Sequence, residues 1–523
     1  MPLVKVVLLT LLLIVSSFSG CTLFRQTHFS LLSFLVDDDA GFPQMSLQFN
    51  TSDLCYLTVT DPHQTILFSN TYYHGIYNES IYLSDYRTTV LPGKYRITAA
   101  DSSKHTIFEN ELSFDGANLT LLSLSADEWS DQDSPSIVAF HLLVKNTGDF
   151  PIYPEGLVIQ QGASFSDASL LPTVVLPFST TQLACFLSLA SFPAGDMPLT
   201  ISLIDNKENV LLQSQQATLQ RNQIGSWEYS WFYLGQHTLK IPQVEWLFDY
   251  YQSLQRVNTV DYAAYVFDPF DDLFIQVLVD QILSLKTLRT ETEKINFVAS
   301  FVQSIEYRND DPENTSYEYP RYPLETLYEK RGDCEDKAIL TAALLDMLKY
   351  NVSLIRLPHH MAVGIYLNET LSGYSFYVDQ YYYLETTTMH MTLGRIPPEY
   401  EGITNVTVYP ISQRPLLIHQ WKSATRYQIS TGEDYVRVVM IVKNLGTSEA
   451  SNLEVDGAFY DNESYLYNIR TTSVSSVTAG EKRLVELSVD VPTFLPEQAT
   501  TLKTQLYLDG VMVNQRESTS RFP

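Results

Sequence analysis

Short runs of alternating apolar and polar residues dominate the chain outside its middle third. Between residues 40 and 126 these runs are separated by turns, and the turn Pro92-Gly93-Lys94 leads into Tyr95-Arg96-Ile97-Thr98. Alternation with a period of two, bounded by turn residues, indicates half-buried strands. The runs are Ser46–Phe49, Cys55–Val59, Thr65–Phe68, Ser80–Leu83, Tyr95–Ala99 and Leu119–Leu124. They predict an immunoglobulin-like β-sandwich over residues 40–126.

The same strand pattern returns in residues 136–222, after a linker at Asp127–Ser134 that is rich in Ser and Asp, and again in residues 420–523. Leu143–Gly148 and Ile441–Gly446 share the motif Val-Lys-Asn-x-Gly, and a second strand-like run follows each of them. We interpret this as an internal duplication and predict a β-sandwich in each region. The shared motif resembles adhesion-related β-sandwich modules of prokaryotic surface proteins.

Residues 225–415 change to helical spacing and then return to strands. Apolar residues with a helical period occupy Val244–Val257, Asp271–Leu285 and Glu291–Val302, and the capping-box pattern Thr290-x-x-Glu293 opens the last run. Asp333 is a suitable N-cap for a helix over Cys334–Tyr350. Three strand-like runs follow, at Met361–Leu367, Ser375–Val378 and Tyr381–Thr386. Helices followed by an antiparallel meander predict an α+β domain over residues 225–415.

Length and charge narrow the class of protein. A chain of 523 residues is too long for one core, and a 45% hydrophobic content is ample for several packed domains. The net charge of -27 comes from 60 acidic and 33 basic residues. A shortage of Lys and Arg argues against nucleic acid as a partner.

The N-terminus predicts export. Lys5 precedes the apolar run Val6–Val15, and small residues follow before Cys21, which is the layout of a signal peptide over residues 1–20. Phe18-Ser19-Gly20-Cys21 resembles a lipobox, and this resemblance implies that Cys21 is lipidated and that residues 21–39 form a tether. The alternative is an uncleaved membrane anchor. Both predict a membrane-anchored protein that faces outside the cell.

Sequons and the remaining cysteines fit an exported chain. Asn-X-Ser/Thr sequons predict a glycoprotein and occur at Asn50, Asn78, Asn118, Asn314, Asn351, Asn368, Asn405 and Asn462. Cys55 and Cys185 fall in different predicted domains. We expect two separately buried thiols rather than a disulfide.

Candidate chemistry is concentrated around Cys334. This cysteine lies in Gly332-Asp333-Cys334-Glu335-Asp336, where a loop gives way to a predicted helix. Unpaired N–H groups at a helix start favour a thiolate and can hold an oxyanion. His360 and Glu385 follow on two predicted strands. Cysteine, histidine and carboxylate are the residue types of a nucleophile, its base and the group that orients the base.

These segments resemble the transglutaminase-like superfamily. The matched pieces are Gly332-Asp333-Cys334-Glu335-Asp336, His360-Met361-Ala362-Val363-Gly364 and Tyr382-Tyr383-Leu384-Glu385-Thr386-Thr387. The resemblance is close over about residues 320–390 and looser back to about 225. It implies a fold and mechanism akin to papain, in which Cys334 attacks an amide carbonyl, His360 holds its proton and Glu385 orients His360. Most of the superfamily has Asp where this chain has Glu385.

Other assignments compete at these positions. His359 is the rival base, although alternation along a strand points only one of the two histidines at Cys334. Asp379 is the rival orienting carboxylate, but it falls at a predicted turn. Cys334 could also be an inert buried cysteine at a helix start. A zinc site would need closely spaced ligand pairs, which the chain lacks, so we expect no metal and no other cofactor.

The sequence therefore predicts a multidomain surface protein, with an α+β papain- or transglutaminase-like core flanked by immunoglobulin-like β-sandwiches. The expected function is cysteine-dependent hydrolysis of an amide bond in a protein or peptide, or acyl transfer, in either case through a thioester. The alternative is a non-catalytic adhesion or scaffold protein that retains the fold. Oligomeric state and calcium dependence stay open.

Overall fold

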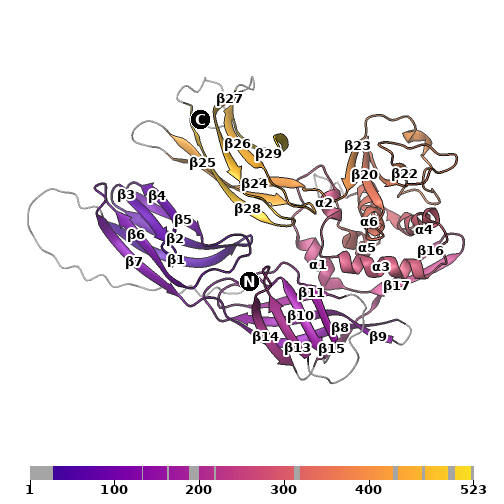
Figure 1. Cartoon of the computed structure of the whole chain (residues 1–523), viewed down its shortest axis with the longest axis horizontal. Coiled ribbons are helices and arrows are strands. Elements are labelled where there is room, and N and C mark those ends of the chain that lie inside the picture. The colour runs from indigo at the N-terminus through magenta and orange to yellow at the C-terminus, as the bar shows by residue number, and fades with distance from the viewer. Residues whose placement is uncertain are drawn as a thin grey trace, which may run out of the picture. The chain divides into compact units, whose positions relative to one another are not determined.

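The computed structural model of the chain describes residues 28–131, 134–161, 164–187, 199–216, 219–310, 319–427, 434–461, 466–492 and 501–519. The predicted signal peptide, Cys21 and the sequons at Asn314 and Asn462 lie outside these ranges. The chain divides into two compact units, and Figure 1 labels their helices and strands. The described residues of the first unit fall within 28–126, 140–185 and 199–220. The remaining described residues belong to the second unit. None of the described helices combines the length and the apolar character needed to cross a membrane.

The first β-sandwich is built from strands β1–β7 in two antiparallel sheets, with the orders β1-β2-β5 and β4-β3-β6-β7. Its strands are β1 (Phe29–Asp39), β2 (Phe42–Thr51), β3 (Cys55–Thr60), β4 (Ile66–Tyr72), β5 (Gly75–Tyr82), β6 (Gly93–Ala100) and β7 (Thr106–Phe114). Alternate residues of the inner strands are buried, as the period-2 pattern predicts. Residues 29–39 therefore belong to a strand, where the sequence analysis expected a tether.

The second β-sandwich repeats this strand order. Its strands are β8 (Leu119–Asp131), β9 (Ser134–Asn146), β10 (Gly156–Gln161), β11 (Ser164–Ser169), β12 (Thr180–Phe186), β13 (Leu199–Ile204), β14 (Val210–Gln216) and β15 (Gln220–Gln223). They form the sheets β12-β9-β8-β15 and β11-β10-β13-β14. Leu119–Leu124 thus joins this sandwich and not the first one, because alternation identifies a strand but not the sheet that it enters. Residues 127–131 continue strand β8, where the sequence analysis expected a linker.

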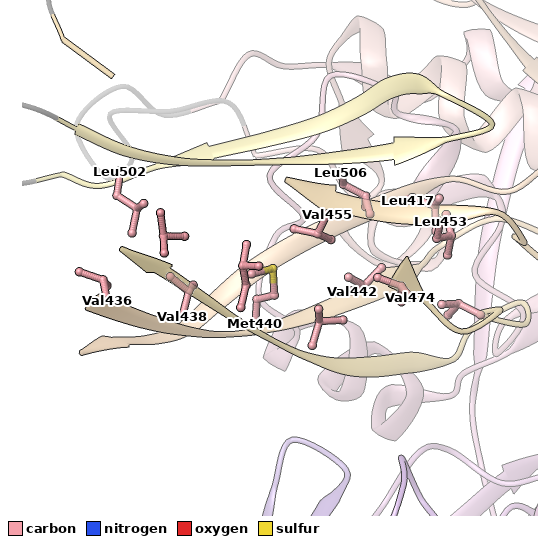
Figure 2. Packing of buried hydrophobic residues seen from close by; sticks show 14 of the residues in the cluster. Leu417, Val436, Val438, Met440, Val442, Leu453, Val455, Val474, Leu502 and Leu506 are labelled. Carbon is pink, nitrogen blue, oxygen red and sulfur yellow. The ribbon is translucent and has the colours of Figure 1, made fainter. Parts of the chain in front are cut away.

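The third β-sandwich has the sheets β24-β25-β28 and β27-β26-β29-β30. Its strands are β24 (Leu417–Tyr427), β25 (Tyr435–Asn444), β26 (Leu453–Tyr460), β27 (Leu466–Val474), β28 (Lys482–Asp490), β29 (Thr501–Leu508) and β30 (Val511–Glu517). Figure 2 shows Val436, Val438, Met440 and Val442 of β25 in its core. The seven-strand order of the first sandwich thus recurs in the second and third, so the described residues contain three copies of one topology, one more than the predicted duplication.

The Val-Lys-Asn-x-Gly motif makes the same contacts in the second and third sandwiches. The Asn146 side chain donates to the carbonyls of Phe150 and Val175 and accepts from the N–H groups of Asn118 and Gly148. The Asn444 side chain donates to the carbonyls of Ser448 and Val477 and accepts from Leu416 and Gly446. A Cβ at Gly148 or Gly446 would come within 2.0 or 2.2 Å of a carbonyl oxygen. The matching contacts explain why both Asn and Gly recur in the motif.

The α+β domain lies in the second unit. Its helices are α1 (Glu245–Ser253), α2 (Ala263–Val266), α3 (Asp272–Ser284), α4 (Glu291–Gln303), α5 (Pro323–Glu329) and α6 (Cys334–Met347). The capping box predicted at Thr290 and Glu293 is present at the start of α4. A hairpin of β16 (Ser226–Phe232) and β17 (Gln236–Pro242) packs on α4 through ring contacts of Tyr229 and Trp231 with Phe301.

An antiparallel sheet with the order β22-β21-β20-β23 completes the domain. Its strands are β20 (Asn351–Leu357), β21 (His360–Tyr366), β22 (Tyr382–Leu384) and β23 (Thr407–Ile411). Ser375–Val378, which the sequence analysis expected as a strand, makes only an isolated bridge from Val378 to Tyr381. The first strand of the meander is instead β20, which the sequence analysis assigned to no element.

Candidate active site

Cys334 is the first residue of α6, and the turn before it is fixed by a capping box. The Asp333 carboxylate accepts from the Asp336 N–H, and the Asp336 carboxylate accepts from the Asp333 N–H. Gly332 leaves room for this arrangement, because a Cβ there would lie 2.7 Å from Cβ of Asp336. Since Cys334 stands at the first helical position, its backbone N–H has no acceptor within the helix and is free to stabilise an oxyanion.

His360 is the first residue of β21 and follows a tight turn. Leu357 pairs with His360, so Pro358 and His359 form the two-residue connection between β20 and β21. His359 has a φ of 58° and an exposed side chain, whereas His360 is 9% exposed. His is among the non-glycine residues that tolerate this left-handed conformation best. The structure thus turns His360, and not His359, toward the interior of the domain.

Glu385 meets His360 across two strands of the sheet. Val363 pairs with Leu384 in the antiparallel ladder, and continuing this register places Glu385 opposite Ala362, on the face that also carries His360. Oε2 of Glu385 lies 3.2 Å from Nε2 of His360. A carboxylate only accepts, so Nε2 carries the proton and Nδ1 is left to serve as a base.

Further donors hold the Glu385 carboxylate, which is 1% exposed. Tyr383 O–H donates to Oε2 at 2.7 Å, and the N–H and hydroxyl of Thr387 donate to Oε1 at 2.8 and 2.5 Å. Burial raises the pKa of Glu385, but the hydrogen bond and charge of His360 and the Thr387 contacts outweigh it and lower the pKa to about 2. Glu385 is therefore ionised and oriented.

Asp379, the rival carboxylate, points elsewhere. It lies with Gln380 in the tight turn between Val378 and Tyr381, and both turn residues have positive φ values, of 47° and 67°. Its side chain is exposed. Of the two carboxylates proposed from the sequence, only Glu385 contacts His360 in the described residues.

The Cys334 sulfur lies at the start of β21, but its hydrogen bonds are with groups other than the His360 ring. Sγ donates to Oε2 of Glu335 at 3.1 Å, and the backbone N–H of Met361, the residue after His360, donates to the sulfur. Among the described residues no hydrogen bond joins Cys334 to His360. The structure thus brings His360 and Glu385 together and places the sulfur beside the histidine's neighbour.

Two tyrosines lie close enough to Cys334 to interact with it electrostatically. Tyr400, in the 3-10 turn Pro398–Tyr400, stacks on the His360 ring with centroids 4.6 Å apart and an interplanar angle of 3°. Tyr307 lies beside Gly332, because β18 (Glu306–Tyr307) pairs in parallel with β19 (Arg331–Gly332). Tyr400 holds the imidazole plane, and Tyr307, which is 49% exposed, lies at the solvent side of the site.

Comparison with known families identifies this region. Residues 279–409, from within α3 to β23, match the family model described as a transglutaminase-like domain. The chain contains a transglutaminase-like domain. The match includes Cys334, His360 and Glu385, and it agrees with the resemblance seen in the sequence.

Solved structures and curated proteins add little to this assignment. Red sea bream transglutaminase is 12% identical over 72% of this chain and 79% of its own, with a TM-score of 0.15. An exo-chitosanase of Amycolatopsis orientalis is 12% identical over 35% of this chain, with a TM-score of 0.15, and the alignment spans 26% of the exo-chitosanase. The CupB2 chaperone of Pseudomonas aeruginosa is 10% identical over 34% of this chain and 92% of its own, with a TM-score of 0.12. TM-scores this low do not indicate a shared overall fold. No curated protein sequence matches the chain.

The thiol of the transglutaminase-like domain lies in an acidic environment. Burial, and then the charge and hydrogen bond of Glu335, raise the pKa of Cys334. Burial and the neighbouring Glu335 also raise the pKa of Asp333, and burial raises the pKa of Glu335 itself. From the sequence, the helix start favours a thiolate, whereas the negative charge of Asp333, Glu335 and Asp336 disfavours one. In the structure, burial and then the carboxylate of Glu335 outweigh the helix start, and Cys334 is a neutral thiol.

The same carboxylates make up the groups of the domain that could hold a metal ion. Ligand atoms of Asp333, Cys334 and Glu335, and those of Asp310, Asp333 and Asp336, lie within 4.8 Å of one another in the described residues. Arg321 contacts Asp310 at 2.8 Å and Asp336 at 2.6 Å. The second group is therefore an ion-pair network around Arg321, and the first is the hydrogen-bonded surroundings of the thiol.

Glu335→Gln is expected to accelerate alkylation of Cys334. The substitution keeps the shape of the side chain but removes the charge that disfavours the thiolate, and lowering the thiol pKa by one unit increases the thiolate fraction about tenfold. Iodoacetamide labelling at pH 7, followed by mass spectrometry, measures the rate. Glu399→Gln, at an exposed acidic residue next to Tyr400, is the control. An unchanged or slower rate in Glu335→Gln would show that Glu335 does not control the thiol.

Several residues of the site were not predicted from the sequence, among them Tyr383, Tyr400 and Gln303. Tyr383 had a usable signal, because a residue two positions before Glu385 on a strand shares its face. Tyr400 and Gln303 reach the site from a 3-10 turn and from the end of α4, and no spacing along the chain indicates this.

Proposed function

We propose that the transglutaminase-like domain is a cysteine-dependent acyl-transfer or amide-hydrolysing enzyme. The observation that carries the proposal is the contact between Nε2 of His360 and Oε2 of Glu385, at 3.2 Å, next to a helix that begins with Cys334. A buried, ionised carboxylate that holds one imidazole nitrogen leaves the other nitrogen to accept a proton from a thiol.

In the proposed first half-reaction, the Cys334 thiol leaves Glu335 and gives its proton to Nδ1 of His360. The sulfur adds to an amide carbonyl, and the Cys334 N–H stabilises the resulting oxyanion. His360 then protonates the leaving nitrogen, the C–N bond breaks, and a thioester and a free amine result. In the second half-reaction His360 takes a proton from water or from an amine, which attacks the thioester and releases the thiol.

The proposed substrate is a protein or peptide outside the cell, and the proposed location is the cell surface. The N-terminal layout of residues 1–21 supports export with a lipid or membrane anchor. The sequons offer further support, because the six sequon asparagines in the described residues all have exposed side chains: Asn50, Asn78, Asn118, Asn351, Asn368 and Asn405. The β-sandwich modules would then act as spacers or adhesive surfaces.

A second candidate function is a non-catalytic scaffold that retains the fold. One observation favours it: the thiol donates to Glu335, and its pKa is raised. A thiol held in this way throughout would be inert.

Substrate profiling tests the proposed function. The protein is incubated with a library of glutamine-containing peptides, with and without a primary amine, and the products are analysed by mass spectrometry. Hydrolysis gives cleaved or deamidated peptides, and acyl transfer gives peptides that carry the amine. We expect one of these products from the native protein. No product under any condition would favour the scaffold.

A further inference from the structure

Gln303 reaches from the end of helix α4 to the backbone of the Glu385 segment. It is the last residue of α4 and is 3% exposed. Its side-chain amide donates to the carbonyl of Glu385 at 2.9 Å and to the carbonyl of Met391 at 2.9 Å. Both donor hydrogens of the amide are thus used, one at each end of the segment 385–391.

This contact matters because the strand before Glu385 is short. The β21–β22 ladder pairs Val363 with Leu384 and ends there, so Glu385 lies one residue beyond its last pair. The backbone N–H groups of Thr386 and Thr387 turn back to the Glu385 carboxylate. The Gln303 amide is therefore the contact that fixes the Glu385 carbonyl where the sheet no longer does.

Lys337 ties the same helix end to the helix of the nucleophile. It lies one turn after Cys334 in α6 and is fully buried. Its ammonium group donates to the carbonyl of Ile305 at 2.8 Å and to that of Gln303 at 3.3 Å. A cation at a helix C-terminus satisfies carbonyls that lack partners within the helix. Lys337 thereby connects α6 to the end of α4.

We propose that Gln303 is a positioning residue, which together with Lys337 fixes the Glu385 carboxylate relative to the helix that carries Cys334. The contacts run from α6 through the Lys337 ammonium to the Gln303 carbonyl, and from the Gln303 amide to the Glu385 carbonyl. Gln303 touches none of the reacting atoms, so it acts through Glu385 and His360. This inference rests on the proposed function, in which Glu385 orients the catalytic base.

Gln303→Met tests the proposal, because it keeps the volume of the side chain and removes both donors. Asn296→Leu is the matched control. Asn296 also lies on α4, is 9% exposed and accepts from the N–H of Leu393 at 2.8 Å, so it anchors the same loop without touching Glu385. Unfolding in urea measures the stability of both variants and allows the readouts to be compared at similar stability.

The first readout is kinetic. We expect Gln303→Met to lower kcat by about 10- to 100-fold with KM changed by less than about twofold, as supporting contacts around catalytic groups generally do. Asn296→Leu should change kcat by less than about threefold, because the Glu385 backbone keeps its contact. Equal losses of kcat in the two variants would mean that Gln303 only stabilises the fold, and they would overturn the proposal.

The second readout does not require turnover. Protein labelled with ¹⁵N-histidine should show a downfield Nε2–H resonance for His360, which is hydrogen-bonded to Glu385 and absent in His360→Ala. The signal should broaden or vanish in Gln303→Met and persist in Asn296→Leu. If the protein proves inactive, this signal still decides the positioning role. If Gln303→Met does not fold, Gln303→Asn, one methylene too short to reach both carbonyls, replaces it. Persistence of the resonance in the folded variant would refute the proposal.

Discussion

Cys334→Ala is expected to abolish turnover, with a loss of roughly 10⁴-fold or more, because no thioester can form without the sulfur. Little stability should be lost. In the described structure the hydrogen bonds of the sulfur are those with the Glu335 carboxylate and the Met361 N–H, and alanine is a strong helix former at the first position of α6. We expect the free energy of unfolding to fall by at most about 1 kcal/mol. Product formation and urea unfolding measure the two effects.

Matched cysteine variants provide the control for this result. Cys55 and Cys185 are free and buried, as the sequence analysis expected, and burial raises the pKa of Cys185 to about 12. Cys55→Ala and Cys185→Ala should leave turnover unchanged. Turnover that survives in Cys334→Ala would exclude the thioester mechanism.

Glu385→Gln is expected to lower turnover by about 10²- to 10⁴-fold and to destabilise the domain. The carboxylate accepts from His360, Tyr383 and Thr387, and an amide group in its place turns donors toward donors. His360 then loses the acceptor that fixes its tautomer. Breaking a buried charged contact of this kind costs about 3–5 kcal/mol of folding free energy. Steady-state kinetics and urea unfolding at neutral pH measure both losses.

The destabilisation caused by Glu385→Gln should depend on pH in a definite direction. The pKa of Glu385 in the folded protein is about 2, below its ordinary value of 4.5. Its contribution to stability is therefore complete above pH 4.5 and is lost as the pH falls toward 2. Urea unfolding at several pH values should show the difference between Glu385→Gln and the native protein shrinking below pH 4.5.

Asp379→Asn is the matched control for Glu385→Gln. It changes the rival carboxylate, which is exposed in a turn, and it should alter neither turnover nor stability appreciably. If Asp379→Asn were the more damaging substitution, Asp379 rather than Glu385 would be the orienting group.

Local signals predicted the elements that local contacts determine. The capping patterns at Thr290 and Asp333 placed the starts of α4 and α6 at the residues where the structure has them, because a cap is satisfied within one helical turn. Alternation along the chain identified strands β2 to β6 of the first sandwich, but it missed β1 and β7. The antiparallel meander also predicted that residues on two neighbouring strands, His360 and Glu385, come together.

The pairing of strands and the contacts between distant segments could not be predicted from the sequence. The Leu119–Leu124 run could pair with strands on either side of it, and only the assembled sheet decides. Strand β20 follows helix α6 almost directly, so its apolar run could not be separated from the helical pattern. Ser375–Val378 has strand-like residues but no neighbour to complete a ladder. The roles of Tyr400 and Gln303 arise from contacts between segments far apart in sequence.

The sequence showed that acidic residues flank Cys334, but only the structure shows which of them contacts its thiol. A cysteine at a helix start is expected to be acidic, but Glu335, the next residue, folds back to accept from the thiol. In the proposed mechanism the thiolate is therefore formed during the reaction, with His360 as the base, and is not stored in the resting site. This assignment makes the reactivity of Cys334 depend on a residue with which it shares no hydrogen bond at rest.

The central claim is that the reactivity of Cys334 depends on His360, and the rate of Cys334 alkylation tests it most directly. Iodoacetamide labelling at pH 7 is followed by mass spectrometry in the native protein and in His360→Ala, with Cys334 identified by its peptide. We predict that labelling of Cys334 in His360→Ala is at least about tenfold slower than in the native protein, because the thiol loses its base. Labelling that is slow in the native protein and unchanged in His360→Ala would contradict the claim and favour the scaffold.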